Sequence, residues 1–267
     1  MNHRPRKRFG QNFLRDDAII HAIEQAVAPT DSDHVVEIGP GTGALTGAIL
    51  KSGCQMDVIE LDRDLTAGLL ASFSIYPRFT LHTADALAFD FSELMKSNRT
   101  LRVIGNLPYN ISTPLIMRLL NQDRLIHDMH FMLQLEVVER LAAKPGTKAW
   151  GRLGVMAQYH CQVEHLFDVP PEAFFPSPKV KSAVVRLTPH SNQPWPGVDT
   201  VLLRKVVAQA FSQRRKTLHN NFKDVYDDAT LRSIGIDPSQ RAETLELRDF
   251  IALAKLAEQI AHTTSSD

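Results

Sequence analysis

The chain has 267 residues, of which 43 % are hydrophobic and 22 % are charged, and 30 acidic side chains balance its 30 basic ones. This composition is typical of a globular protein and excludes a disordered, collagenous or coiled-coil chain. No apolar run approaches the roughly 18 residues that a membrane span needs. We therefore expect a globular fold with a sizeable core and no membrane partner.

Cysteine content and the start of the chain indicate a compartment. The two cysteines, Cys54 and Cys161, are too few for a disulfide framework, which fits a reducing cytoplasm. The basic start has no apolar stretch behind it, so we do not expect a signal peptide. No CxxC or HExxH pattern occurs, which argues against a zinc site. We expect a cytoplasmic protein that holds no metal.

Short apolar runs alternate with helical patterns from Asp33 to Thr188. The predicted strands are His34–Ile38, Met56–Leu61, Phe79–His82, Arg102–Ile104, Met129–Leu133 and Ala183–Leu187. The predicted helices are Leu45–Lys51, Leu65–Ser72, Pro114–Leu120, Val137–Ala143 and Leu153–Cys161. This alternation favours a mostly parallel α/β sheet covered on both faces. The segments Val163–Val169 and Val180–Leu187 are expected to pair antiparallel at one end of it.

The last third of the chain has a different pattern. Residues 189–196 contain three prolines and are interpreted as a linker. Helical patterns then continue at Val201–Phe211, Lys216–Phe222, Ala229–Ile234 and Leu245–Ile260. We expect an α/β domain over residues 1–190 and a small all-helical domain over residues 197–267.

A glycine-rich turn follows the first predicted strand directly, with glycine at Gly39, Gly41 and Gly43. Glycines let the chain turn tightly and let a ligand approach the main chain closely. The first strand of an open parallel sheet delivers such a turn to its carboxyl edge, where these folds bind ligands. The turn therefore predicts a site for a nucleotide or nucleoside.

The acidic residues after this turn indicate which class of nucleotide or nucleoside binds. The next strand ends at Glu60, whose carboxylate can accept hydrogen bonds from both hydroxyls of a ribose. A dinucleotide-binding G-x-G-x-x-G turn would need glycine at Thr46, which argues against a nicotinamide-dependent oxidoreductase. The pattern of three glycines preceded by Glu37 instead resembles the turn of S-adenosylmethionine-dependent methyltransferases. That resemblance implies that Glu60 holds the ribose and that Asp85 accepts from the adenine amine.

The fourth predicted strand runs into Asn106-Leu107-Pro108-Tyr109. This tetrad resembles the signature of enzymes that methylate planar amino groups, although in isolation it is also an ordinary strand-to-helix turn. An adenine amine is a poor nucleophile because its lone pair is delocalised into the ring. Acceptors at the Asn106 side chain and the Leu107 carbonyl favour the pyramidal amine that attack requires. Pro108 stiffens the turn, and Tyr109 offers a face on which the base can stack.

Four motifs together resemble the ribosomal RNA adenine dimethyltransferases, and they are Phe9–Leu14, Glu37–Gly43, Asn106–Tyr109 and Phe174–Val180. The resemblance covers nearly the whole chain. It implies a Rossmann-like methyltransferase sheet and a helical C-terminal domain that binds RNA or the ribosome. It also implies that Phe174 stacks on the target base opposite Tyr109. The residues it places around the cofactor S-adenosylmethionine are Asn12, Leu14, Gly39, Gly41, Glu60, Asp85 and Asn106.

The opening motif and the helical tail resemble the small-subunit branch of this family. That resemblance implies dimethylation at N6 of two adjacent adenosines in the 3′-terminal hairpin of 16S RNA, in an assembling small ribosomal subunit. We expect a monomer. Phe175 stands where a polar group is more usual, at a position that looks permissive.

Basic side chains gather in two stretches although the whole chain is neutral. Residues 1–15 contain five basic residues and no acid, and residues 179–223 contain nine basic residues with Asp199 as the single acid. Such stretches fit contacts to RNA phosphates, with a solvated surface as the alternative. The residues expected to contact RNA are Arg4, Arg6, Lys7, Arg8, Lys179, Lys181, Arg214, Arg215 and Lys216.

Other functions remain open at this point. The chain is either an enzyme or a non-catalytic ribosome-assembly factor that retains the fold, and the enzyme's target is either the 16S adenosines or an adenosine of 23S RNA. An N6-adenine DNA methyltransferase usually shows Asp-Pro-Pro-Tyr in place of the tetrad found here.

Overall fold

The computed structural model describes residues 11–95 and 99–264. The chain divides into two compact units, one formed by residues 1–138 and 162–189 and the other by residues 139–161 and 190–267. The second unit therefore contains the C-terminal segment predicted to be helical and, in addition, an earlier segment of the chain. Among the helices within the described ranges, none has both the length and the apolar character needed to cross a membrane.

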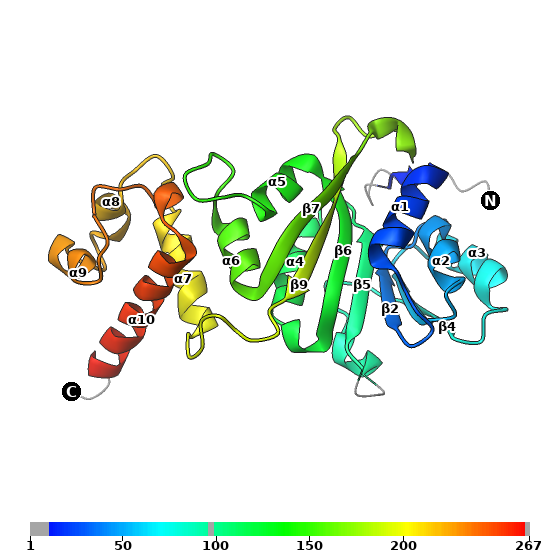
Figure 1. Cartoon of the computed structure of the whole chain (residues 1–267), viewed down its shortest axis with the longest axis horizontal. Helices are drawn as coiled ribbons and strands as arrows, with labels where there is room; N and C mark the ends of the chain where they lie inside the picture. Colours follow the sequence, from blue (N-terminus) through cyan, green and yellow to red (C-terminus); the bar gives the residue numbers. More distant parts are fainter. Residues whose placement is uncertain (1–10, 96–98, 265–267) are drawn as a thin grey trace. The chain divides into compact units, whose positions relative to one another are not determined.

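A seven-stranded sheet forms the core of the first unit, in the order β4-β3-β2-β5-β6-β9-β7 (Figure 1). The strands are β2 (His34–Ile38), β3 (Gln55–Glu60), β4 (Phe79–Thr83), β5 (Leu101–Asn106), β6 (Ile126–Gln134), β7 (Cys161–Val169) and β9 (Ser182–Pro189). The five strands from β4 to β6 run parallel, and β9 pairs antiparallel with β6. The predicted mostly parallel sheet is confirmed, and the two closing segments lie side by side at one end.

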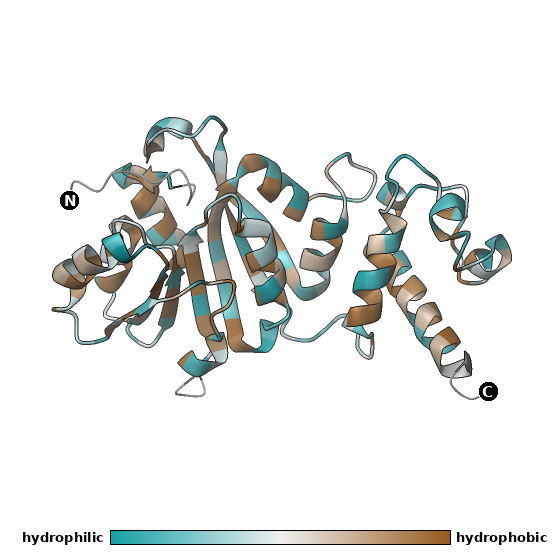
Figure 2. Ribbon diagram, turned by 180° about the vertical axis from the view of Figure 1, so that it is seen from behind, coloured by the Kyte–Doolittle hydropathy of each residue, from teal (hydrophilic) through white to brown (hydrophobic). Residues whose placement is uncertain are grey.

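The centre of this sheet is covered on both faces, since every residue of β2 is buried. On one face, Ile23 and Ile49 of the neighbouring helices pack with Val35, Val58 and Ile104 of the strands in one apolar cluster. Brown apolar stretches alternate with teal polar ones along the central strands in Figure 2. The helices are α1 (Asp17–Val27), α2 (Ala44–Leu50), α3 (Arg63–Phe73), α4 (Ser112–Leu120) and α5 (Leu135–Leu141), with short 3₁₀ turns at Phe91–Leu94, Asp123–Leu125 and Pro171–Ala173.

Helix α1 and the segment before it are features that the sequence did not predict. Asp16 caps the helix, because its side chain accepts from the backbone nitrogens of Ala18 at 2.9 Å and Ile19 at 3.2 Å; such a cap contributes about 1 kcal/mol. Strand β1 (Phe13–Leu14) precedes the cap and pairs antiparallel with β8 (Phe174–Phe175). This two-stranded ribbon joins segments that are far apart in the sequence.

The second unit is helical and combines most of the segment predicted to be a helical domain with an earlier helical segment. Its elements are α6 (Arg152–His160), α7 (Thr200–Ala210), α8 (Leu218–Phe222), α9 (Asp228–Ser233), α10 (Leu247–Thr264) and a 3₁₀ turn at Ala242–Thr244. The rings of Phe211 and Phe250 stack with their centroids 5.7 Å apart. The buried Trp150 donates its Nε1–H to the Leu245 carbonyl at 2.9 Å. That hydrogen bond ties the earlier segment of the unit to its C-terminal helices.

Candidate functional site

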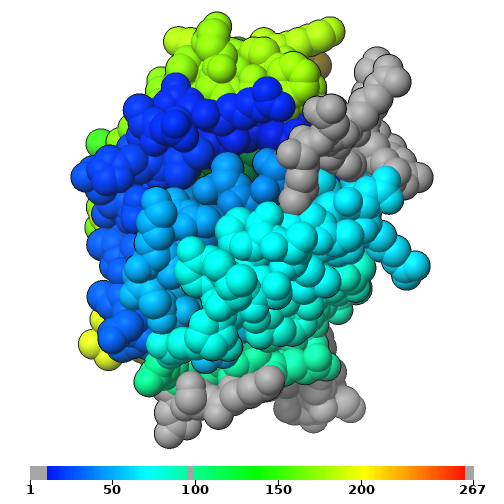
Figure 3. All heavy atoms as spheres, turned by 90° about the vertical axis from the view of Figure 1, so that its right-hand side faces the viewer, coloured from blue at the N-terminus to red at the C-terminus, as the bar shows by residue number. Residues whose placement is uncertain are grey.

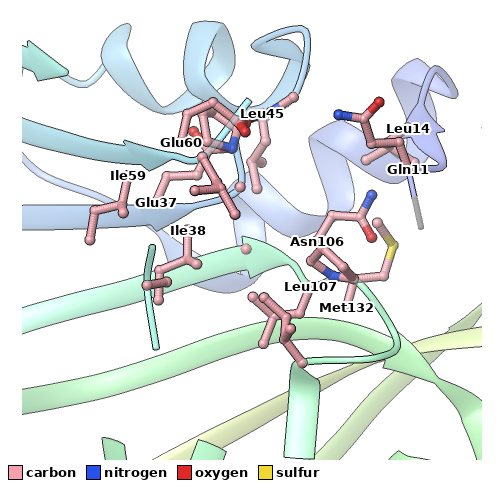
Figure 4. A pocket seen from close by; sticks show the side chains of 18 of the residues that line it. Gln11, Leu14, Glu37, Ile38, Leu45, Ile59, Glu60, Asn106, Leu107 and Met132 are labelled. Atoms are coloured by element: carbon pink, nitrogen blue, oxygen red, sulfur yellow. Dashed lines mark hydrogen bonds between the residues drawn. The ribbon is translucent and has the colours of Figure 1, made fainter. Parts of the chain in front are cut away.

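A cavity of about 190 Å³ lies at the carboxyl ends of β2, β3 and β5 (Figure 4). Glu37, Glu60 and Asn106 reach it from these three strands. Gln11 and Leu14 line it from the N-terminal segment. Open parallel sheets bind ligands at this edge. The structure thus brings residues from three separate sequence motifs to one cavity within the first unit.

The glycine turn packs too tightly for side chains. Gly41 has φ +58°, and a Cβ there would lie 2.9 Å from the Phe13 ring. Gly39 donates its N–H to the Ile59 carbonyl at 2.9 Å, which joins the turn to the end of β3. A Cβ at Gly105 would lie 2.6 Å from the carbonyl oxygen that ends β2. The backbone itself therefore forms much of this wall of the cavity.

Glu60 is held by the turn that it faces. Its Oε2 accepts from the Gly41 N–H at 3.3 Å and its Oε1 from the Asp62 N–H at 2.7 Å. Burial raises the pKa of Glu60, and these hydrogen bonds offset only part of that rise. Gln11 Nε2 donates to Asp62 at 2.9 Å and brings the N-terminal segment to the same corner. Glu60 is therefore fixed in place through both carboxylate oxygens, and it lines the cavity.

Asp85 lies at the rim of the cavity and is exposed. Its Oδ1 accepts from the Leu87 N–H at 2.9 Å, which fixes the loop after β4. The apolar side chains of Leu61 and Ala86 also line the cavity. The second acid expected from the sequence thus lies beside a surface suited to a planar ring.

Glu37 lines the cavity, although the sequence pattern indicated it only as the residue before the glycine turn. It is 2 % exposed, and Thr46 Oγ1 donates to it at 2.5 Å. Burial raises the pKa of Glu37 to about 7, and the nearby Glu60 adds to the rise. An acid before a glycine turn is the signal that identifies this residue in the sequence. The cavity therefore contains two carboxyl groups whose ionisation is disfavoured.

The tetrad at the end of β5 has a fixed geometry. Asn106 Nδ2 donates to the Asn12 carbonyl at 2.8 Å, which orients the amide and leaves its Oδ1 as an acceptor. The Leu107 N–H donates to the Met132 carbonyl at 3.2 Å. The Pro108 carbonyl accepts from the first residues of α4. The tetrad is thus held by the N-terminal segment, by β6 and by the helix that follows it.

Tyr109 lies beside this tetrad in the cavity lining. Its Oη lies 3.1 Å from Ser182 Oγ at the start of β9. Burial raises the pKa of Tyr109, so its phenol is neutral at physiological pH. The hydrogen bond fixes the ring and connects the tetrad to the segment that leads from β8 to β9.

Phe174 does not line the cavity. Its side chain is 5 % exposed and belongs to the apolar cluster that contains Leu14, its partner across the β1–β8 ribbon. The exposed ring is that of Phe175, at 48 %. Stacking by Phe174 on a base would require its ring to leave the core, so that role stays a prediction.

The basic residues predicted to contact RNA divide into three groups. Arg4, Arg6, Lys7 and Arg8 lie outside the described residues. Lys179 and Lys181 are exposed on the segment between β8 and β9. Arg214, Arg215 and Lys216 are exposed on the second unit. Arg214 is partly engaged there, because it donates to the Lys148 carbonyl and lies 3.6 Å from Glu243.

Buried residues at the inner end of the cavity were not predicted from sequence. His130 and Met132 on β6 line it together with Val184 on β9. Burial lowers the pKa of His130 to about 4, so its ring is neutral at physiological pH. In the described part of the chain, no group of three or more His, Cys, Asp or Glu residues is arranged to hold a metal ion.

Comparison with protein families and curated proteins gives consistent matches. The family model described as ribosomal RNA adenine dimethylase matches residues 2–259. "Ribosomal RNA small subunit methyltransferase A" of Pseudomonas fluorescens is 55 % identical over 99 % of this chain and 98 % of the relative. The protein of the same name from Pseudomonas aeruginosa is 56 % identical over 96 % of each chain.

Solved structures show the same architecture. A dimethyladenosine transferase from Plasmodium falciparum has a TM-score of 0.78 and 25 % identity, with 92 % of this chain and 98 % of that chain covered. The 23S rRNA methyltransferase ErmE has a TM-score of 0.72 at 24 % identity, covering 93 % of this chain and 100 % of that one. The second likeness concerns the fold alone.

Proposed function

The chain belongs to the ribosomal RNA adenine dimethylase family, and on this premise we propose that it dimethylates N6 of two adjacent adenosines in the 3′-terminal hairpin of 16S RNA, with S-adenosylmethionine as methyl donor. The observation that carries the proposal is the 55–56 % identity, over nearly the full length, to relatives named as small-subunit methyltransferases. The Asn106 amide, which lines a cavity with two buried carboxyl groups and is oriented by Asn12, supports it. We propose that it acts in the cytoplasm, as a monomer, on an assembling small subunit.

The residues of the cavity fit the cofactor. S-adenosylmethionine supplies an electrophilic methyl group on a positively charged sulfur. The buried carboxyl groups of Glu37 and Glu60 suit a ligand with positive charge. Glu60 would accept hydrogen bonds from the ribose hydroxyls, Leu61 and Ala86 would contact the adenine, and Asp85 would accept from its amine. Asn12, Leu14, Gly39 and Gly41 also line the cavity.

The tetrad then prepares the nucleophile. In the first transfer to each adenosine, the Asn106 Oδ1 and the Leu107 carbonyl would accept from the two N–H bonds of the adenine amine and so localise its lone pair. Pro108 keeps this turn rigid and Tyr109 stacks on the base. The methylated aminium is strongly acidic and loses its proton to water, so no side chain needs to act as a strong base. Bringing the base into the cavity requires that it leave its stack.

Contacts to the RNA backbone complete the proposal. Lys179 and Lys181 extend from the segment that also holds Ser182 against Tyr109, so phosphates bound there lie near the target base. Arg215 and Lys216 of the second unit, with Arg214 beside them, supply a further phosphate surface. The N-terminal basic residues Arg4, Arg6, Lys7 and Arg8 are proposed for the same purpose.

The test is transfer of labelled methyl groups from S-adenosylmethionine to undermethylated small ribosomal subunits, followed by nucleoside analysis of the RNA. We expect N6,N6-dimethyladenosine at two adjacent positions of the 16S RNA. Label that appears only in 23S RNA would move the target to the large subunit. Tight binding to subunits without any transfer would instead identify a non-catalytic assembly factor.

A further inference from the structure

An arginine covers an exposed aromatic ring beside the cavity. The guanidinium carbon of Arg15 lies 4.2 Å from the centroid of the Phe175 ring. Phe175 is 48 % exposed and Arg15 is exposed as well. A large apolar ring in water is unfavourable unless it has a partner, and a stacked arginine accounts for only part of its surface.

Both ends of the segment that carries Phe175 are fastened to the site. Phe174 pairs with Leu14, which lines the cavity, and the Arg15 N–H donates to the Ala173 carbonyl at 2.8 Å. At the other end Ser182 bonds Tyr109 of the tetrad. In Figure 3 the yellow-green segment around β8 lies directly against the blue segment that carries β1 and α1. Phe175 pairs with Phe13, which lines the cavity, so its segment adjoins the cavity although Phe175 itself is not part of the lining.

The segment that follows this ring suits a polyanion. Lys179 and Lys181 follow on the same segment and are exposed, and no acid occurs between Glu172 and Ser182. Phosphates bound by these lysines would place their bases near the ring. Unpaired bases stack on aromatic rings and on guanidinium planes, and this contact tolerates any base because every base has a π-face.

We propose that Arg15 and Phe175 form a stacking platform for an unpaired RNA base that neighbours the methylated adenosine. The proposal rests on the function proposed above and adds a second base contact to it. The platform holds the flanking nucleotide outside the helix while the target base occupies the cavity. It gives the exposed Phe175 a binding role that is separate from the buried Phe174.

The direct test uses a single-stranded oligoribonucleotide that contains 2-aminopurine, whose emission is quenched when the base stacks. Phe175→Leu keeps apolar volume but removes the π-face, and we expect its dissociation constant for the probe to rise about 5- to 150-fold with loss of quenching. Phe175→Trp keeps an aromatic face and should retain the wild-type affinity for the probe and the quenching. Arg15→Lys keeps the charge but loses the planar group, and a rise of about 2- to 5-fold is expected. Ile75→Thr, at another exposed apolar residue of the same unit, is the control that should leave binding unchanged.

Kinetics on undermethylated small subunits give the second readout. In Phe175→Leu the KM for subunits should rise more than kcat falls, while the dissociation constant of S-adenosylmethionine stays that of the wild type. Equal probe affinity and equal KM for the Leu variant and the wild type would overturn the platform. If Phe175→Leu lost affinity for intact subunits but bound the probe normally, the surface would contact a ribosomal protein and not a base. That result would also overturn the platform. If the wild type transfers no methyl group, the proposed function fails. Binding of the probe to the wild type and to Phe175→Leu still tests whether Arg15 and Phe175 stack on a base.

Discussion

The parallel strands carry buried charged groups at both ends, and the two ends differ in how these groups are compensated. In the half of the sheet nearer the amino ends, the Asp57 carboxylate of β3 lies 2.6 Å from His34, the first residue of β2, and 2.6 Å from His82, which reaches it from β4. Burial alone would raise the pKa of Asp57, but the two histidines outweigh it and hold that pKa well below its usual range. Arg102 likewise donates to Asp128 from two nitrogens, at 3.1 and 2.7 Å.

At the carboxyl ends the compensation is missing. Burial raises the pKa values of Glu37 and Glu60, and neither carboxyl group forms an ion pair with a basic side chain in the described ranges. Buried ionised groups without partners are unfavourable, so this end of the sheet costs stability. A positively charged ligand removes that cost. The ion pairs near the amino ends therefore stabilise the fold. The carboxyl groups at the carboxyl ends lack a cationic partner until a positively charged ligand binds.

The largest effect is expected at the amino ends. Arg102→Met leaves the buried Asp128 and the half-buried Asp33 without their cation, and we expect the free energy of unfolding to fall by about 3–5 kcal/mol. Denaturant titration measures it. Arg186→Met removes the more exposed pair with Glu164 and should cost at most about 1 kcal/mol. If both variants lost the same free energy of unfolding, the buried Arg102 ion pairs would contribute no more to stability than the exposed Arg186 pair.

The next effect tests the catalytic edge. Asn106→Ala removes one of two acceptors for the amine, and we expect the rate of methyl transfer to fall about 100- to 1000-fold. Cofactor affinity should change far less, as measured by equilibrium binding. Asn110→Ala, at an exposed residue of the same cavity lining, is the matched control and should keep most of the rate. A rate above half of the wild type for Asn106→Ala would contradict the assigned role.

A pair of variants on β3 compares the two ends directly. Glu60→Ala should weaken S-adenosylmethionine binding by about 1.5–3 kcal/mol, because hydrogen bonds to a charged group are lost. Asp57→Asn should instead lower the free energy of unfolding and leave the affinity of the folded protein unchanged. Calorimetric binding and thermal unfolding of both variants measure the two quantities. The comparison fails if Glu60→Ala binds normally or if Asp57→Asn loses affinity.

The same comparison explains which parts were predictable from the sequence. The glycine turn, Glu60 and Asn106 each follow a strand directly, and a parallel sheet brings all strand ends of one kind to one edge. Their meeting at one cavity therefore follows from local patterns. The strand at His34–Ile38 was predicted with the bounds that the structure has.

Long-range contacts account for what the sequence did not provide. The β1–β8 ribbon pairs segments whose local sequence gives no register, and this pairing buries Phe174 and exposes Phe175. The ion pairs at the amino ends depend on which strands are neighbours, so Asp57 has no visible partner in the sequence. The raised pKa of Glu37 depends on the depth of its burial, which a motif does not express.

The smallest expected effect is a pH dependence from Glu37, whose sign follows from its shifted pKa. Its pKa is about 7 in the folded protein and has an ordinary value of 4.5. The folded state therefore holds this proton more tightly than the unfolded state does, and the stability from this group is lost as the pH rises from 4.5 through 7. A positively charged ligand favours the ionised carboxylate and so lowers its pKa. Affinity for such a ligand should rise with pH across the same window.

Equilibrium binding of S-adenosylmethionine between pH 5.5 and 8.5 tests this sign. We expect affinity to increase by at most about tenfold per pH unit below pH 7 and to level off above it. S-adenosylhomocysteine lacks the charged sulfur and should show a shallower dependence, which makes it the matched ligand control. Glu37→Gln cannot ionise and should flatten the profile for S-adenosylmethionine. Parallel profiles for both ligands, unchanged in the Gln variant, would show that the uncompensated carboxyl group at this end of the sheet does not respond to the charge of the ligand.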